Sequence, residues 1–311
     1  MPKCFNVIWL GRLLSAVCAM IDAVSDKNHN GRPLISIVIA TSNAGKQLER
    51  CLLSIVSQRF KDLEIVVQDN NSTDQTSSIV KDFIARDEAS ISWQTVSDSG
   101  ISDAWNRAIR RASGEWILFL GADDELADHK ILSKVSVALK GVYPQYLVAY
   151  GRVTLCADDG SVLSVLGRDW QACARDFRSC LEVIPHQGTF HHKSLFHKHG
   201  LFDTGLMIRG DFDYLLRELA LYDAYFIENL LVSRMAFGGI STSREYAYRV
   251  SAETIILYRR HVRKLIPMRL FWDSGKAFAI STLYRIGGNR LAIDCANFYR
   301  KWFRLKEPIC Y

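Results

Sequence analysis

Long apolar runs are scarce in this sequence of 311 residues, and none reaches the roughly 20 residues that a membrane-spanning helix needs. The apolar stretch near the N-terminus is interrupted by Arg12 and Asp22. These leave about nine apolar or small residues between them, at the short end for the core of a signal peptide. We therefore expect residues 1–33 to form an amphipathic segment, and neither a signal peptide nor a spanning helix.

Closely spaced cysteines are also lacking. The eight cysteines include no CxxC pair and no tight group, and a chain of this size does not need a disulfide framework to fold. This usage is typical of reduced thiols in a cytoplasmic protein.

The glycine-rich loops that hold nucleotide phosphates are missing as well. The sequence has no GxxxxGK[ST] loop, and no GxGxxG follows its first predicted strand. It therefore supports neither a P-loop nucleotidase nor a dinucleotide dehydrogenase.

Positive charge is concentrated in one part of the chain. The formal net charge is only +6, in a sequence with ordinary globular composition. Residues 251–311, however, contain 12 Lys and Arg against four Asp and Glu, mixed with aromatic and aliphatic residues at helical spacing. This pattern predicts a basic helical tail that either contacts an anionic membrane surface or packs on the rest of the protein. No recognition motif for nucleic acid accompanies the charge, so we expect no nucleic-acid partner.

Between residues 34 and 126 the sequence alternates between strand-like and helix-like segments. Apolar β-branched runs are followed by segments with apolar residues at helical spacing, at the lengths of βαβ units. The predicted strands are Leu34–Ala40, Leu63–Asp69, Ile91–Asp98 and Trp116–Ala122. The sequence therefore predicts an α/β fold with a doubly wound, mostly parallel sheet, in which ligands bind at the carboxyl ends of the strands.

Polar residues follow each of these strands. They are Thr41 and Asn43 after the first, Asp69 after the second, Asp98 after the third, and Asp123 with Asp124 after the fourth. Because these strand ends share one edge of the sheet, we expect the polar groups to form a single site.

The adjacent carboxylates of Asp123 and Asp124 would repel one another without a cation or hydrogen-bond donors nearby. Mg²⁺ or Mn²⁺ takes one or two protein carboxylates and fills its other positions with water and substrate phosphate. The pair therefore predicts a metal site for a nucleotide diphosphate. The alternative is that one of the two aspartates caps a helix beginning near Leu126.

The segment from Leu34 to Leu126 resembles the nucleotide-sugar-binding half of glycosyltransferase family 2 enzymes, which have the GT-A fold. The resemblance rests on SIVIATSNAGKQ, on LEIVVQDNNSTDQT and on SDSGISDAWNRAIRRASGEWILFLGADDEL, and continues more loosely to about Arg217. It implies that Asp123 and Asp124 form the metal-binding DXD element. The nucleotide-binding set that it implies is Thr41, Asn43, Asp69, Asp98 and Asp123.

A transferase that inverts the anomeric carbon needs one more carboxylate, which accepts the proton of the acceptor hydroxyl. GDFDYLLREL places Asp211 at the start of a predicted helix anchored by an apolar face, made of Phe212, Leu215, Leu216 and Leu219. The resemblance implies that Asp211 is this base. We expect Asp213, assigned to the sugar and acceptor side, to have a structural or supporting role. The alternative is that Asp211 only caps the helix.

Five of the eight histidines lie between residues 185 and 203. A zinc site is one interpretation, but no cysteine is interspersed among them. The resemblance implies instead that His186 and Gln187 lie near the reacting sugar, on the acceptor side.

These features predict three parts, namely an amphipathic segment at 1–33, a GT-A domain at 34–250 divided after residue 126, and a basic helical tail at 251–311. The implied activity is inverting transfer of a sugar from a nucleotide sugar, with UDP favoured, to a glycan or polyprenol-linked acceptor. Such enzymes make polysaccharide, O-antigen or lipopolysaccharide at the inner face of the plasma membrane.

Two other functions remain open. Ser42, Asn70 and Trp105 depart from the family pattern, which leaves open a nucleotide-sugar-binding module that has lost transfer. A sugar-phosphate nucleotidyltransferase also uses a doubly wound sheet and carboxylates, although TSNAGKQ is a poor version of its phosphate-binding loop.

Overall fold

The computed structural model describes residues 31–157, 159–240, 243–262 and 265–303. The predicted amphipathic segment 1–33 lies almost wholly outside these ranges. Within them, no helix has both the length and the apolar character required to cross a membrane.

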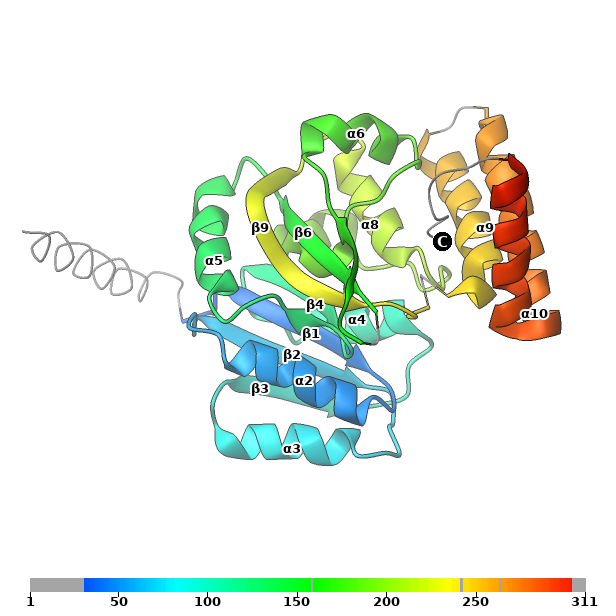
Figure 1. Ribbon diagram of the computed structural model, residues 1–311. Coiled ribbons are helices and arrows are strands. Elements are labelled where there is room, and N and C mark those ends of the chain that lie inside the picture. Colours follow the sequence, from blue (N-terminus) through cyan, green and yellow to red (C-terminus); the bar gives the residue numbers. More distant parts are fainter. Residues whose placement is uncertain (1–30, 158, 241–242, 263–264, 304–311) are drawn as a thin grey trace, which may run out of the picture.

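The first half of the chain forms the parallel part of one nine-stranded sheet (Figure 1). Its strands are β1 (Ile35–Thr41), β2 (Leu63–Asp69), β3 (Ser90–Thr95) and β4 (Trp116–Gly121), in the spatial order β3-β2-β1-β4. The helices between them are α2 (Gly45–Val56), α3 (Thr76–Arg86) and α4 (Ile101–Ile109). All three pairings are parallel. The predicted doubly wound arrangement is confirmed, and its strands end at one edge.

Alternate side chains of the central strands enter different hydrophobic clusters. On β4, Leu118 and Leu120 pack with α2, α3 and α5 (Ile131–Val142), whereas Ile117 and Phe119 pack with α4 and α8 (Gly210–Leu219). Both faces of the sheet are therefore buried. This is why the strands appear in the sequence as continuous apolar runs, without alternating polar residues.

The second half of the chain adds further strands to the same sheet. One of them, β9 (Tyr225–Ala236), reaches the carboxyl edge of the parallel part, where it pairs with the two-residue strand β5 (Glu125–Leu126). β8 (Thr189–His192) pairs antiparallel with β4, and β6 (Val148–Cys156) lies beyond it. The long strand β9 also pairs with β6. The other elements of this half are β7 (Val162–Leu166), α6 (Trp170–Arg178), the 3-10 turn η1 (His186–Gly188) and α7 (Ser194–His199).

The chain after Asp124 overturns one of the predicted alternatives. Leu126 belongs to β5, where it pairs with Ser233 of β9, and helix α5 begins only at Ile131. Neither Asp123 nor Asp124 therefore caps a helix. The strand partner of Leu126 lies more than a hundred residues along the chain, so local sequence did not reveal it.

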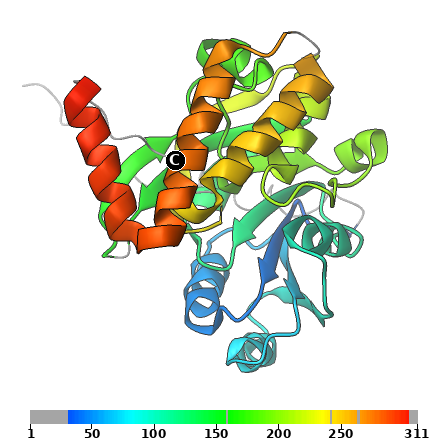
Figure 2. The ribbon, with the colours of Figure 1, turned by 90° about the vertical axis from the view of Figure 1, so that its right-hand side faces the viewer.

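Helix α9 (Ala247–Leu257) and the first part of α10 (Met268–Phe303) lie side by side, and α10 is kinked at Gly288, beyond which it turns away from α9 (Figures 1 and 2). The turn η2 (Arg244–Tyr246) precedes α9, and the π-helical turn η3 (Tyr258–Val262) follows it. Leu257, Tyr258 and Leu270 enter the same hydrophobic cluster as α8. This part of the predicted tail therefore packs on the domain.

Candidate active site

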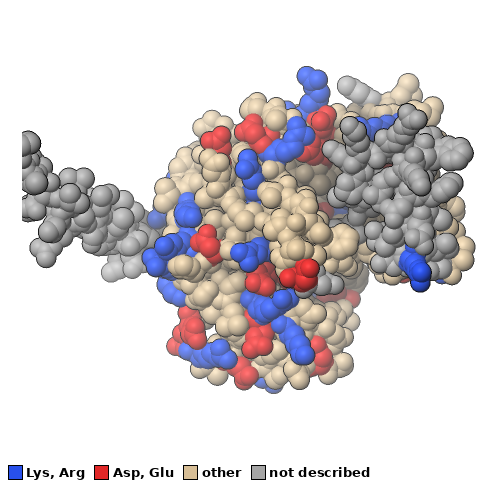
Figure 3. Space-filling view, viewed as in Figure 1, with Lys and Arg blue, Asp and Glu red and all other residues tan. Residues whose placement is uncertain are grey.

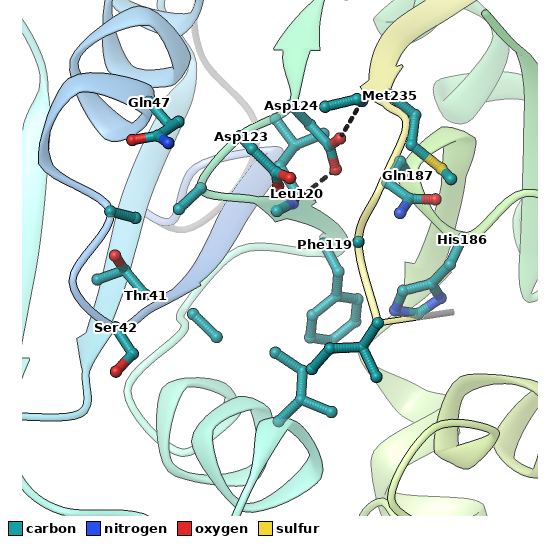
Figure 4. A pocket seen from close by; sticks show the side chains of 18 of the residues that line it. Thr41, Ser42, Gln47, Phe119, Leu120, Asp123, Asp124, His186, Gln187 and Met235 are labelled. Atoms are coloured by element: carbon teal, nitrogen blue, oxygen red, sulfur yellow. Dashed lines mark hydrogen bonds between the residues drawn. The ribbon is translucent and has the colours of Figure 1, made fainter. Parts of the chain in front are cut away.

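A pocket of about 440 Å³ lies at the carboxyl ends of β1 and β4. Thr41 and Ser42 lie on one side of it, His186 and Gln187 lie on the other, and the Asp123–Asp124 pair lies between them (Figure 4). Of the residues predicted for the site, the pocket brings together Thr41, Asn43, Asp123, Asp124, His186, Gln187 and Asp211. Asp69, Asp98 and Asp213 lie outside its lining.

The wall after β1 is held by hydrogen bonds between two loops. Asn43 has a left-handed backbone conformation, with φ of +50°. Its N–H donates to Ser72 Oγ at 2.8 Å, and its Oδ1 accepts from the Thr73 N–H at 2.8 Å. Thr41 lines the pocket, and its Oγ1 is buried and has no hydrogen-bond partner in the described chain.

Asp69 supports this wall from within the protein. One of its carboxylate oxygens accepts from the Ser72 hydroxyl, and the other accepts from the Ser72 N–H at 3.2 Å and from the Thr95 hydroxyl at 2.7 Å. The predicted contact with the nucleotide would need an accessible carboxylate. Because Asp69 is fully buried, it orders the loop after β2 instead.

Asp98 lies three residues beyond the end of β3, which stops at Thr95. Its N–H donates to Asn70 Oδ1 at 3.0 Å, and its carboxylate accepts from the Gly100 N–H at 3.0 Å, where α4 begins. Desolvation raises the pKa of Asp98, although the hydrogen bond from Gly100 opposes the shift. The predicted nucleotide-binding residue therefore organises the turn into α4, the helix whose Trp105 does line the pocket.

Asp123 and Asp124 differ in their surroundings. Asp123 is exposed, whereas Asp124 is only 2% exposed. The Asp124 carboxylate accepts from the Gly121 N–H at 2.8 Å and from the Ala236 N–H at 3.3 Å. Burial, and then the neighbouring charge of Asp123, raise the pKa of Asp124 to about 7. A cation beside these two carboxylates would stabilise their charged forms.

Because Gly121 has no side chain, the carboxylates of Asp123 and Asp124 can both lie next to it. A Cβ atom at this position would lie 2.6 Å from Asp123 Oδ1 and 2.8 Å from Asp124 Oδ2, so the two oxygens converge on one region. In the described part of the chain, no group of three or more His, Cys, Asp or Glu residues could hold a metal ion. A hard cation at this pair would therefore take its remaining ligands from water and substrate, as Mg²⁺ commonly does.

An aromatic cluster forms the opposite side of the pocket. His186 stacks on Phe119, with ring centroids 5.0 Å apart, and contacts Trp105 at 4.8 Å. Neither ring nitrogen of His186 has a hydrogen-bond partner among the described residues. Burial lowers the pKa of His186 to about 3, so the ring is neutral at physiological pH and offers one donor and one acceptor. Trp105, a departure from the family pattern, thus helps to build this wall.

Asp211 lies in the first turn of α8 and lines the same pocket. As predicted, the apolar face of this helix is buried, through Phe212, Leu215, Leu216 and Leu219. Burial raises the pKa of Asp211, and the positive charge of Arg209 opposes only part of that shift. A half-buried carboxylate with a raised pKa is a stronger proton acceptor than an ordinary aspartate.

Asp213 is buried in an ion-pair network outside the pocket. Its carboxylate oxygens lie 2.5 Å from Arg217 Nη2, 2.8 Å from Arg260 Nη1 and 2.8 Å from His261 Nε2. Asp213 therefore joins α8 to η3, which agrees with the structural role expected for it, and it does not line the pocket on the sugar and acceptor side.

Sequence reasoning missed several residues that line the pocket. Met207 and Ile208 precede α8, and Met235 and Ala236 end β9. No local pattern marks these residues. The place of Met235 and Ala236 depends on how β9 pairs with β6 and β5, and Met207 and Ile208 are held by Glu253 of α9.

The sequence matches known proteins over this same region. Residues 36–154 match the family described as Glycosyl transferase family 2. Over 241 residues the chain is 31% identical to the PGL/p-HBAD biosynthesis glycosyltransferase of Mycobacterium bovis (strain BCG / Pasteur 1173P2), an alignment that covers 73% of this chain and 91% of the relative. The chain belongs to glycosyltransferase family 2. This glycosyltransferase is also 35% identical, over 111 residues, to the GalNAc(5)-diNAcBac-PP-undecaprenol beta-1,3-glucosyltransferase of Campylobacter jejuni, with 35% of this chain and 36% of that relative covered.

Two solved structures share the fold of this glycosyltransferase. Mannosyltransferase PcManGT from Pyrobaculum calidifontis, in complex with GDP-Man and Mn²⁺, gives a TM-score of 0.59 at 17% identity and covers 94% of this chain and 90% of its own. S. aureus TarS 1–349, in complex with UDP, gives 0.55 at 18% identity and covers 88% of this chain and 75% of its own. The predicted GT-A architecture is confirmed.

Proposed function

We propose that this glycosyltransferase moves a sugar, with inversion, from a nucleotide-diphosphate sugar to a hydroxyl of a glycan or lipid-linked saccharide. The observation that carries this proposal is the meeting of Asp123, Asp124 and Asp211 in one pocket. The complexes of fold neighbours with UDP and with GDP-Man support the class of donor, and we favour a UDP-sugar. Thr41 and Asn43 would contact the nucleotide, and His186 and Gln187 would contact the sugar.

The names of two relatives support a lipid-linked or glycolipid acceptor. One acts in PGL/p-HBAD biosynthesis, and the other is a glucosyltransferase acting on a PP-undecaprenol saccharide. We therefore place this enzyme in polysaccharide or glycolipid synthesis.

The proposed metal is Mg²⁺ or Mn²⁺, held by Asp123 and Asp124. The convergence of their oxygens beside Gly121 and the raised pKa of Asp124 fit a divalent cation at this place. The Mn²⁺ of a fold neighbour supports the same assignment. Such an ion, when bound, would stabilise the negative charge that develops on the leaving diphosphate.

Asp211 is the proposed general base. It would take the proton of the acceptor hydroxyl while the acceptor oxygen forms a bond to the anomeric carbon and the bond from that carbon to the diphosphate oxygen breaks. Attack opposite to the leaving group inverts the anomeric centre. A base in this role contributes about 10²- to 10⁴-fold in rate.

The test is donor hydrolysis and transfer with UDP-, GDP- and dTDP-sugars, in Mn²⁺ or in EDTA, with lipid-linked acceptors supplied. Asp211→Asn should lower the transfer rate by about 10²- to 10⁴-fold and keep donor binding. Glu228→Gln, at an exposed position of β9, is the matched control and should behave as wild type. Metal-dependent binding without turnover of any donor would favour the binding module instead.

We further propose that α10 makes peripheral contact with the inner face of the plasma membrane. Met268, Phe271, Trp272, Phe278 and Ile286 are each at least half exposed, and their spacing places them along one side of the helix. The opposite side is buried at Leu270 and Ala277. On the face shown in Figure 3, Lys and Arg are interspersed with Asp and Glu over the described residues, so that face presents no field of one sign.

A further inference from the structure

The carboxylate of Glu253, in α9, is buried beneath the segment that leads into the proposed base. It is 2% exposed. Three consecutive backbone N–H groups donate to it, from Met207 at 3.0 Å, Ile208 at 3.0 Å and Arg209 at 2.9 Å. The Arg249 guanidinium adds a fourth hydrogen bond at 2.9 Å. All four acceptor positions of the carboxylate are thus occupied.

The segment that Glu253 holds is part of the pocket. Met207 and Ile208 line it, and Asp211 follows two residues after Arg209. Arg209 is the N-cap residue of α8, but its side chain makes no capping hydrogen bond. Among the described residues, the three N–H groups ahead of α8 find their side-chain acceptor on another helix, and this acceptor fixes where the chain turns into α8.

Other contacts confine the same turn from further directions. A Cβ atom at Gly210 would lie 2.5 Å from Ser102 Oγ, so the start of α8 is packed closely against the start of α4. Asp213, one turn into α8, is paired with Arg260 and His261, which follow α9. The segment from α9 to η3 therefore contacts the chain both before Asp211, through Glu253, and after it, through Arg260 and His261.

From this geometry we infer that Glu253 is a positioning residue for Asp211, and that the C-terminal segment completes the catalytic site. The inference rests on the proposed role of Asp211 as base. Misplacing a catalytic group by about 1 Å can cost about 100-fold in rate. The three bonds to Glu253 limit such a displacement.

Glu253→Gln is the test variant, because glutamine keeps the shape but turns one acceptor into an N–H₂ donor that faces N–H groups. We expect its kcat to fall by about 10- to 100-fold. The Kd for donor and Mn²⁺ should stay within about twofold, since Thr41 and the Asp123–Asp124 pair are untouched. Glu228→Gln is the charge-matched control. A larger loss of donor binding than of kcat would show a general structural role and would overturn the inference.

Hydrogen exchange supplies a second measurement that does not depend on activity. In wild type, the amides of residues 207–209 should exchange slowly, and in Glu253→Gln they should exchange faster while β1 and β4 remain protected. If the variant does not fold, rapid exchange of these three amides in wild type would still overturn the inference, and slow exchange would support it.

The outcomes also separate this inference from the proposed function. If Asp211→Asn is inactive while Glu253→Gln keeps wild-type kcat, the base assignment stands and the positioning role is wrong. If Asp211→Asn is fully active, the base assignment fails, and the positioning role fails with it.

Discussion

Asp213 of α8 and Arg260 of η3 form an ion pair, with 2.8 Å between Asp213 Oδ1 and Arg260 Nη1. Burial by itself would raise the pKa of Asp213. Hydrogen bonds from His261 and Arg217, and then from Arg260, outweigh that effect and hold the pKa of this carboxyl well below its usual range. The pair therefore ties α8 to the C-terminal segment most firmly when Asp213 is ionised.

Replacing Asp213 should destabilise the protein in a pH-dependent way. Asp213→Asn should lower the free energy of unfolding at pH 7 by at least about 2 kcal/mol, because hydrogen bonds between charged groups are lost in a buried site. A depressed folded-state pKa gives stability that is present above the unfolded value, about 4, and lost as the pH falls through the folded value. Urea unfolding at several pH values should therefore show the difference from wild type shrinking below about pH 4. Asp82→Asn, at an exposed position of α3, is the control.

The two carboxylates after β4 should separate metal binding from folding. Asp123→Ala should abolish Mn²⁺-dependent donor binding and leave the melting temperature nearly unchanged, because Asp123 is exposed. Asp124→Ala should abolish Mn²⁺-dependent donor binding and also lower the melting temperature, since the Asp124 carboxylate accepts hydrogen bonds from Gly121 and Ala236. Calorimetric titration with Mn²⁺, with and without donor, checks this, and unaltered binding by Asp123→Ala would contradict the metal assignment.

Gly121→Ala should damage the same site by crowding alone. The new Cβ would meet the Asp123 and Asp124 oxygens at 2.6 and 2.8 Å and force them apart. We expect at least tenfold weaker Mn²⁺ binding, within the range of about 10- to 100-fold seen when partners that orient metal ligands are changed. Gly141→Ala is the control, because a Cβ there meets nothing within 4 Å. Wild-type affinity in Gly121→Ala would mean that the ion lies elsewhere.

We expect the activity to decline at low pH. The decline should occur at a higher pH than it would if the general base were an ordinary aspartate. Burial raises the pKa of Asp211, and only the ionised form accepts a proton. The kcat of transfer should therefore decline as the pH drops through a value above 3.8. A pH profile at saturating donor and metal measures this limb, and an acid limb at or below the ordinary aspartate value would count against Asp211 as the base.

Membrane contact through α10 can be measured directly by vesicle sedimentation. Each of Phe271 and Trp272 would contribute about 1.5–3 kcal/mol if it were fully buried in lipid. Phe271→Ser with Trp272→Ser should therefore weaken binding to vesicles containing anionic lipid at least tenfold. Leu221→Ser is the control, since Leu221 is 81% exposed outside α10. Equal binding by both variants would exclude this face.

Much of the architecture could be predicted from the sequence because its signals are local. The buried strands β1, β2 and β4 appear as apolar runs, and the face that anchors α8 repeats at helical spacing. Asp124 and Asp211 could be assigned to a pocket because the residues around them match a family pattern. Asp69 was predicted to touch the nucleotide on the same grounds, but the pattern cannot distinguish a carboxylate at the surface from one satisfied by Ser72 and Thr95.

The sequence by itself thus determined the alternation of strands and helices, the edge at which the site lies and the carboxylates that characterise it. Only the tertiary structure decided which of those carboxylates face the pocket and which hold it together. It placed Ala236 against Asp124 and Glu253 beneath the turn into Asp211. These contacts join residues more than 40 positions apart, and local propensity and periodicity contain no information about pairs that meet only when the chain has folded.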